Sequence, residues 1–436
     1  MRKEQRVELE KKLNLQNLAW KSFVVKNLSI YFTRIYIIKA FVVALLLSAF
    51  IYLDYFELTF TPINSLCAVV GFYLLLGEHR VVWYWSGFFI GVLWFYWISF
   101  SFVYYDLAFL IPFIILGIAC VYGLLFWVIG RFGKTIYLQV PLLLGVSFID
   151  PFGFNWLKLE VILLDTYFST RYEAFILFMI GVGCLKLFSN KYKVFGVLPL
   201  LASLTFLWSV PNSETVDTLN VAIPHMNTPQ SQRWDAAYQK EAIALNFKLI
   251  EQAIAENKEL IILPETAFPL YLNQASKITD ALRDYSHNIA IVTGSLTYDE
   301  EKGFFNSSYF FHEGKMQIAH KIILVPFGEE IPFPEFFVDI INRLFFDGAK
   351  DYQKAKEPQN FIINGKAFRS AICYEATTNK LFQNTPKQMI AISNNAWFSP
   401  STEQTLQHLL LRYYAKKYQT TIYHSANSGK SGIIKP

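Results

Sequence analysis

The sequence predicts a polytopic α-helical membrane domain followed by a soluble α/β domain. Of its 436 residues, 53% are hydrophobic and only 17% are charged, and the mean hydropathy is +0.30. That composition is too apolar for a single soluble domain. Long apolar runs fill residues 36–211, whereas residues 216–436 contain short apolar runs between polar segments. A basic segment at 1–35 precedes both, so we expect three regions with these boundaries.

The apolar half contains seven runs that we interpret as transmembrane helices. The hydrocarbon core of a bilayer is about 30 Å thick, which takes about 20 helical residues to cross. The runs lie near 36–53, 60–77, 82–104, 107–130, 136–151, 173–188 and 194–211. We therefore expect about seven spans.

The charges between these runs predict the orientation of the chain in the membrane. Loops that carry Lys and Arg stay in the cytoplasm during insertion. With the basic N-terminal segment inside, one set of loops holds cations, and the opposite set holds acidic residues and a longer stretch, 152–172, of mixed charge. The first set includes Arg80, Arg131, Lys134, Lys186, Lys191 and Lys193, and the second includes Asp54, Glu57 and Asp106. Seven spans then place the soluble domain outside the cytoplasm, which is the periplasm if the chain sits in a cell inner membrane.

The polar half alternates predicted strands and helices. Apolar runs at 219–224, 260–264, 289–298, 306–311, 361–373 and 389–393 are typical of strands. Segments 233–256, 275–287 and 402–418 have helical patterns. The pair Asn364-Gly365 favours a type I′ hairpin turn, so two strands are expected to meet there and lead into Cys373.

Several classes of protein and site find no support in the sequence. The net charge of +5 is not gathered into long basic runs, so nucleic-acid binding is not expected. Three of the four cysteines lie in apolar runs, which leaves Cys373 alone in the polar half without a disulfide partner. No metal-ligand spacing and no nucleotide-binding motif occurs, so we expect no metal and no cofactor.

Three reactive side chains adjoin strand-like runs of the polar half. Glu265 follows LIILP, Lys321 precedes IILVP, and Cys373 follows SAI. Each has an ordinary explanation by itself, as a loop residue, an edge residue or a buried thiol. Together they supply a base, a fixed cation and a nucleophile, which is the set needed for acyl transfer through a thioester.

The motifs around these residues resemble the nitrilase superfamily. They are LPET (263–266), HKIILVPFGEEIPF (320–333), CYEA (373–376) and ISNNAWF (392–398). With a membrane half that contains GFFIGVLWFYWIS (87–99) and FGFNWL (152–157), the chain is similar to the apolipoprotein N-acyltransferase family. The resemblance implies an α-β-β-α sandwich for the polar half.

The resemblance also implies roles for individual residues. Glu265 matches the general base, Lys321 the cation that stabilises the tetrahedral oxyanion, and Cys373 the nucleophile. The implied donor is a membrane phospholipid similar to phosphatidylethanolamine. The implied acceptor is the N-terminal α-amine of a diacylglyceryl-cysteine apolipoprotein.

Further residues match supporting positions of the family. Glu329 and Glu375 match its supporting carboxylates, and Tyr374 matches the aromatic residue after the nucleophile. Trp234 matches a tryptophan near the acyl site, although a core position at a helix start is an equal reading. We expect Asn306 to serve a hairpin instead of the chemistry.

Two other functions use the same features. One is a membrane-tethered amidase acting on small carbon–nitrogen substrates, and the other is a scaffold whose nitrilase-like domain is inactive. The family pattern also continues beyond an SANSG-like segment with more strands and a last transmembrane helix. Because the chain ends at Pro436, we expect either a shortened lineage or a truncated reading frame.

Overall fold

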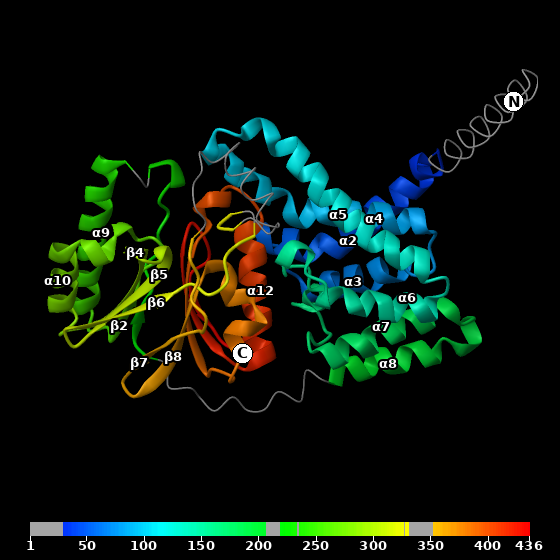
Figure 1. Cartoon of the computed structure of the whole chain (residues 1–436). Helices are drawn as coiled ribbons and strands as arrows, with labels where there is room; N and C mark the ends of the chain where they lie inside the picture. The colour runs from blue at the N-terminus through cyan, green and yellow to red at the C-terminus, as the bar shows by residue number, and fades with distance from the viewer. Residues whose placement is uncertain (1–28, 206–218, 233–234, 327, 331–351) are drawn as a thin grey trace, which may run out of the picture.

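The computed structural model describes residues 29–205, 219–232, 235–326, 328–330 and 352–436. Its helical domain and its α/β domain lie side by side (Figure 1). The expected boundary at 211–216 and nearly all of the basic segment 1–35 lie outside the described residues.

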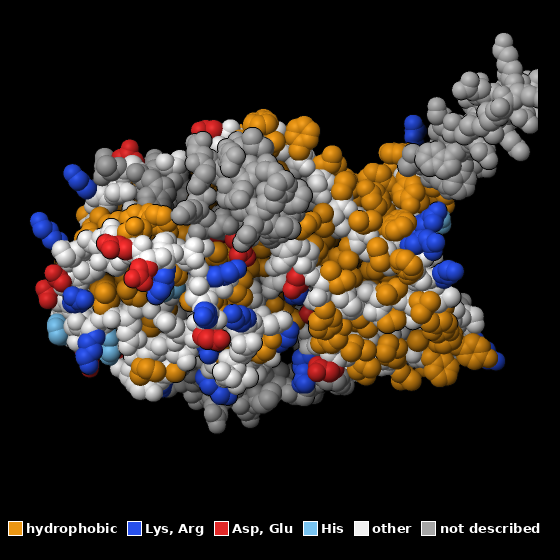
Figure 2. All heavy atoms as spheres, in the orientation of Figure 1, with side chains coloured by type: hydrophobic (Ala, Val, Ile, Leu, Met, Phe, Trp, Pro, Cys, Tyr) orange, Lys and Arg blue, Asp and Glu red, His pale blue; other side chains and the backbone are white. Residues whose placement is uncertain are grey.

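The helical domain packs apolar helices against one another. They are α2 (Arg34–Tyr55), α3 (Thr61–Leu75), α4 (Arg80–Phe95), α5 (Ile111–Phe132), α6 (Ile136–Gly145), α7 (Tyr172–Leu187) and α8 (Val194–Thr205). Glycines bring α4 and α5 close together, because a Cβ on Gly87 would lie 2.4 Å from the carbonyl oxygen of Tyr122. The outer surface of this domain is covered by hydrophobic side chains (Figure 2).

Within the described residues, four stretches are long and apolar enough to cross a membrane. They are Arg34–Tyr55, Arg80–Tyr105, Ala108–Phe132 and Ile136–Gly153. Helices α3, α7 and α8 coincide with predicted runs but have only 15, 16 and 12 residues. A multi-pass membrane domain is therefore confirmed, while the count of seven spans stays a prediction.

The second domain is a sandwich of two sheets. The first sheet has the order β1-β2-β4-β5-β6, with β3 beside β4, and the second has the order β11-β10-β9-β8-β7. The first contains β1 (Val221–Ala222), β2 (Leu260–Ile262), β3 (Phe268–Tyr271), β4 (Ala290–Asp299), β5 (Gly303–His312) and β6 (Lys315–His320). The second contains β7 (Asn360–Ile363), β8 (Lys366–Ile372), β9 (Gln388–Asn394), β10 (Thr421–Asn427) and β11 (Gly432–Ile434).

Helices cover the outer faces of both sheets. Helices α9 (Ala236–Ala255) and α10 (Ser276–Tyr285) cover the first sheet, and α12 (Glu403–Tyr418) lies between the second sheet and the membrane domain (Figure 1). Apolar residues of both sheets, such as Val292 and Ile390, share one buried cluster between them. The expected α-β-β-α sandwich is confirmed.

The hairpin that leads to the cysteine forms as predicted. Ile363 pairs with Lys366 across the turn. Asn364 has φ +49° and Gly365 has φ +75°, and two positive values in succession define a type I′ turn. Strand β8 ends at Ile372, directly before Cys373.

The prediction of a strand after Lys321 is wrong. Lys321 instead follows strand β6, and residues 322–326 are not part of a strand. The backbone N–H groups of Ile322 and Ile323 donate to the buried carboxylate of Glu375 at 2.7 and 3.1 Å. Because a side chain takes these donors, they are not available to a neighbouring strand.

Helix α12 joins the sandwich to the membrane domain. The guanidinium of Arg412 forms a two-point ion pair with Asp165, with one N–O distance of 2.8 Å. The hydroxyl of Tyr413 donates to the buried carboxylate of Glu160 at 2.6 Å. These contacts fix the second sheet, and the cysteine at the end of β8, relative to the transmembrane helices.

Candidate active site

Cys373 lies at a sharp turn between strand β8 and a short helix, Cys373–Thr377. Its φ is +55°, a left-handed conformation that is uncommon for residues other than glycine. The side chain is half-buried, and the side-chain amide of Gln407 on α12 lies 3.7 Å from the sulfur. The turn thus holds a thiol at a fixed point just beyond the C-terminal end of strand β8.

A network of carboxylates and one amine faces this thiol across the pocket that they share. The ammonium of Lys321, which is fully buried, lies 2.6 Å from a carboxylate oxygen of Glu329. The side-chain amide of Asn306 donates to Glu265 at 2.7 Å and to Glu329 at 2.9 Å. Asn306 lies in the β4–β5 hairpin, as expected, and its side chain also binds both carboxylates at once.

Glycine on strand β4 gives Glu265 its position. A Cβ on Gly294 would lie 2.5 Å from the Cα of Glu265 and 2.6 Å from the backbone nitrogen of Thr266. The backbone N–H of Gly294 also donates to the carbonyl of Pro264 at 3.2 Å. Only a residue without a side chain lets the segment 264–266 lie this close to the sheet.

Glu375 connects the turn at Cys373 to the segment that follows Lys321. It is 2% exposed and accepts three backbone N–H bonds, from Ile372 at 2.9 Å and from Ile322 and Ile323. Burial raises the pKa of Glu375 to about 7, although Lys321 and these N–H donors lower it. Glu375 therefore holds these two backbone segments together, and it does not line the pocket of the thiol.

Tyr374 turns away from the thiol towards the membrane domain. Its hydroxyl donates to the carbonyl of Gly153 at 2.9 Å and accepts from the backbone N–H of Asn155 at 3.0 Å. Its ring stacks on Phe154 with centroids 5.6 Å apart. Tyr374 therefore fixes the cysteine turn to the loop that contains the FGFNWL segment.

Burial and charge set the protonation states in the site. Burial, together with the charge of Glu265, raises the pKa of the Cys373 thiol well above its ordinary value, although Lys321 opposes this. Burial alone would lower the pKa of Lys321, but Glu329 and Glu265 outweigh it and raise that pKa. The resting site accordingly holds a neutral thiol beside a charged ammonium.

Two family models cover most of the chain. Residues 34–206 match the model described as the apolipoprotein N-acyltransferase integral membrane domain, and residues 221–435 match the carbon-nitrogen hydrolase model. The chain is 43% identical over 399 residues to a protein of Wolinella succinogenes named apolipoprotein N-acyltransferase, covering 90% of this chain and 94% of that one. The chain belongs to the apolipoprotein N-acyltransferase family.

Two more relatives named apolipoprotein N-acyltransferase support the same family. A protein of Campylobacter jejuni is 36% identical over 428 residues, covering 98% of this chain and 95% of that one. A protein of Helicobacter pylori is 40% identical over 358 residues, covering 80% and 82%. These matches give the amidase alternative no support.

In this member of the acyltransferase family, one pocket gathers four of the predicted site residues. A cavity of about 290 Å³ is lined by Glu265, Lys321, Glu329 and Cys373. Tyr374 and Glu375 support it from outside, and Trp234 lies outside the described residues. Sequence reasoning missed Gln407 near the thiol and the contacts of Asn306 with two carboxylates. The available signal was a polar side chain in an unusual place: Gln407 on a buried helix face, and Asn306 on a buried strand.

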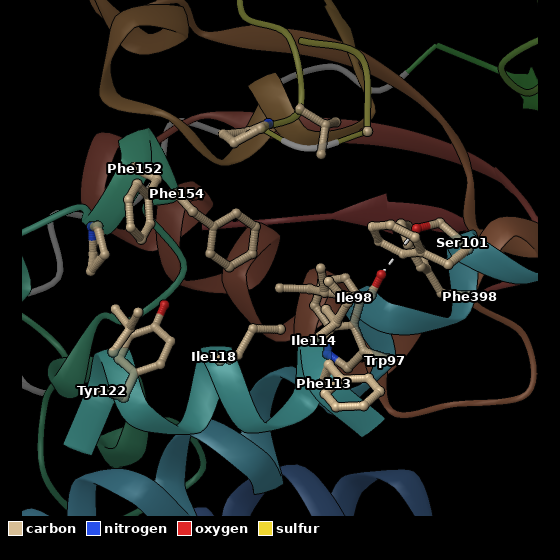
Figure 3. A pocket seen from close by; sticks show the side chains of 17 residues that line it. Trp97, Ile98, Ser101, Phe113, Ile114, Ile118, Tyr122, Phe152, Phe154 and Phe398 are labelled. Carbon is tan, nitrogen blue, oxygen red and sulfur yellow. Dashed lines mark hydrogen bonds between the residues drawn. The ribbon is translucent and has the colours of Figure 1, made fainter. Parts of the chain in front are cut away.

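A second, apolar cavity of about 310 Å³ adjoins the first. It is shaped by α5, by the residues that follow α4 and by the loop 151–154, and its aromatic lining is seen in Figure 3. Among its lining residues are Trp97, Ile114, Ile118, Tyr122, Phe152 and Phe154. Both cavities are lined by Ser101, Val325, Gly328 and Phe398, so they meet at those residues. An apolar space between the membrane domain and the α/β domain thus borders the pocket of the thiol.

Proposed function

We propose that the chain moves an acyl group from a membrane phospholipid to the N-terminal α-amine of a diacylglyceryl-cysteine apolipoprotein, through a thioester on Cys373. The relatives' shared name supports N-acylation of apolipoproteins. The observation that carries the mechanism is the shared pocket in which a base, a cation and a thiol meet next to an apolar cavity.

In the first step, Glu265 takes the proton of Cys373 as the sulfur attacks the carbonyl carbon of the phospholipid ester. The carbonyl oxygen becomes an oxyanion, and the ammonium of Lys321 stabilises it. The C–O bond then breaks, Glu265 returns the proton to the leaving glyceryl oxygen, and a lysophospholipid departs. The acyl group remains on sulfur as a thioester.

In the second step, the neutral α-amine of the acceptor attacks the thioester carbonyl. Glu265 takes a proton from the attacking nitrogen, and Lys321 again stabilises the oxyanion. The C–S bond breaks, the amide forms, and the proton returns to the sulfur. The ester supplies an activated acyl group, so these steps need no nucleotide or metal ion.

The apolar cavity offers a place for the acyl chain during both steps. A chain of about sixteen carbons costs roughly 12 kcal/mol to expose to water, at about 0.8 kcal/mol per methylene. The cavity borders the pocket of the thiol and lies against α5, which carries exposed apolar residues such as Phe113 and Leu116. A chain entering from the bilayer would stay in apolar surroundings until its ester reaches the sulfur.

Acyl labelling of the purified full-length chain tests this proposal. Liposomes with an acyl-labelled phosphatidylethanolamine should transfer label to the protein, and hydroxylamine should release it. Cys373→Ala should abolish the label, whereas Cys184→Ala, a cysteine of α7, should keep it. A diacylglyceryl-cysteine peptide should then remove the label as an amide. Label on Cys373→Ala, or loss of acyl to water alone, contradicts the proposal.

We also propose that the sandwich lies on the periplasmic side of a cell inner membrane, as the charge distribution between spans indicates. Lys302→Cys places a thiol in the exposed turn between β4 and β5. In intact spheroplasts, a membrane-impermeant maleimide should react with it. Protection until the membrane is opened would reverse the orientation.

A further inference from the structure

We propose that a pocket at the end of the membrane domain farthest from the α/β domain binds the phosphate of an anionic lipid. The pocket lies where α4 and α6 begin and α5 ends, and its volume is about 600 Å³. Figure 2 shows Lys and Arg side chains gathered at this end of the domain, beyond the hydrophobic surface. This site is separate from the pocket of Cys373 and does not depend on acyl transfer.

Positive charge dominates the lining of the pocket. Arg80, Arg131 and Lys134 line it, and none of them forms an ion pair with another described residue. The Nε atom of Arg80 is buried, and within the part of the chain that the structure describes it has no hydrogen-bond partner. The lining includes one carboxylate, that of Glu78, which is already paired with Lys39 at 3.3 Å. An anion in the pocket would meet three cations.

Backbone groups of the pocket favour an anion as well. Helix α6 begins here, and the side chain of its N-cap residue, Thr135, makes no capping hydrogen bond. The start of a helix carries partial positive charge and backbone N–H donors, which suit a phosphate. The C-terminal carbonyls of α5 would oppose an anion here, but three carbonyls at this end are already taken. Those of Ile129 and Phe132 accept the backbone N–H groups of Gly133 and Lys134, and that of Gly133 accepts the side-chain amide of Gln139 at 2.9 Å.

Apolar neighbours favour a lipid over a free phosphate ion. Tyr137 and Leu187 line the same pocket, and they are 68% and 36% exposed. Phe132, at the end of α5, is 61% exposed beside it. Exposed aromatic and aliphatic side chains next to the cations suit a ligand whose charged head carries acyl chains. Basic pockets between transmembrane helices bind lipid phosphates for this reason.

The basic residues at this end also orient the chain during insertion, so the test needs controls that share that role. Arg131→Gln/Lys134→Gln removes two exposed cations of the pocket. Lys191→Gln/Lys193→Gln removes two exposed cations from the loop between α7 and α8, outside the pocket. The second pair matches the first in charge and should keep wild-type lipid binding.

Native mass spectrometry of the full chain released from nanodiscs provides the measurement. Nanodiscs that contain phosphatidylglycerol are compared with nanodiscs that contain phosphatidylethanolamine. Any lipid bound at the active site is retained equally by all variants, so differences between variants report on the basic pocket. We expect selective retention of phosphatidylglycerol by the wild type. Each cation near the surface contributes roughly fivefold in affinity, so the Arg131/Lys134 pair should weaken retention about 25-fold.

Defined outcomes would overturn the proposal. Equal retention of the two lipids by the wild type would do so, as would unchanged retention in the Arg131/Lys134 pair or an equal loss in the Lys191/Lys193 pair. Millimolar inorganic phosphate is added in a separate arm. If it displaces the bound lipid, the pocket is a soluble-anion site and the lipid assignment is wrong. Gel filtration and acyl-transfer rate in detergent, both expected at wild-type values, show that each variant is folded.

Discussion

Gly294→Ala tests whether the backbone of strand β4 sets the position of the proposed general base. The added Cβ would lie 2.5 Å from the Cα of Glu265 and 2.6 Å from the nitrogen of Thr266. Both contacts are with backbone, so no side-chain rotation relieves them. Ordinary van der Waals contact begins at 3.4 Å, so the segment 264–266 must move by about 0.9 Å.

A displacement of this size should slow the reaction while leaving the protein folded. A shift of about 1 Å in a reacting group lowers a rate roughly 100-fold. Overpacking of this kind destabilises a protein by about 1–3 kcal/mol. We therefore expect Gly294→Ala to remain folded, with a slightly lower Tm, and to lose about two orders of magnitude in kcat.

The assay is acyl transfer to a diacylglyceryl-cysteine peptide by detergent-solubilised protein, with Tm and gel filtration on the same samples. Gly328→Ala is the matched control, because its Cβ would meet its nearest neighbour, Val325, at an ordinary 3.4 Å while lining the same pocket. A folded Gly294→Ala with more than half of the wild-type rate would refute the reasoning. An equal loss in Gly328→Ala would do the same.

Two further variants and one pH dependence test the site. Asn306→Asp replaces the amide that donates to Glu265 and Glu329 with a third carboxylate. Repulsion among the three carboxylates should lower kcat about 100-fold in folded protein, and a wild-type rate would contradict the bridging role of Asn306. Gly117→Phe puts a ring into the apolar cavity, where a Cβ at this position has open space. In an assay with phospholipids of mixed chain length, this variant should prefer donors with shorter acyl chains. Gly145→Phe, which also has open space but lies outside the cavity, should keep the wild-type preference. Because burial raises the pKa of Cys373 well above its ordinary value, its alkylation rate should climb from pH 7 to pH 9 as the thiolate fraction grows, and a plateau below pH 8 would contradict this.

The sequence alone determined the two-domain architecture and singled out four residues that line the pocket of the thiol. Apolar runs of bilayer length need no tertiary context to be recognised, because lipid imposes the same demand on every span. The Asn364-Gly365 turn was equally local, since two adjacent residues with positive φ define it. The motifs around Glu265, Lys321 and Cys373 are short segments whose residues are neighbours in the chain.

Only the tertiary structure decided how these positions cooperate. Asn306 meets Glu265 across 41 residues, and Tyr374 meets Asn155 across 219, so neither contact leaves a local pattern in the sequence. The error after Lys321 has the same origin, since a distant carboxylate, Glu375, takes the N–H groups that a strand would use. Packing between separate sheets and domains sets such contacts, because the groups meet only once the chain has folded.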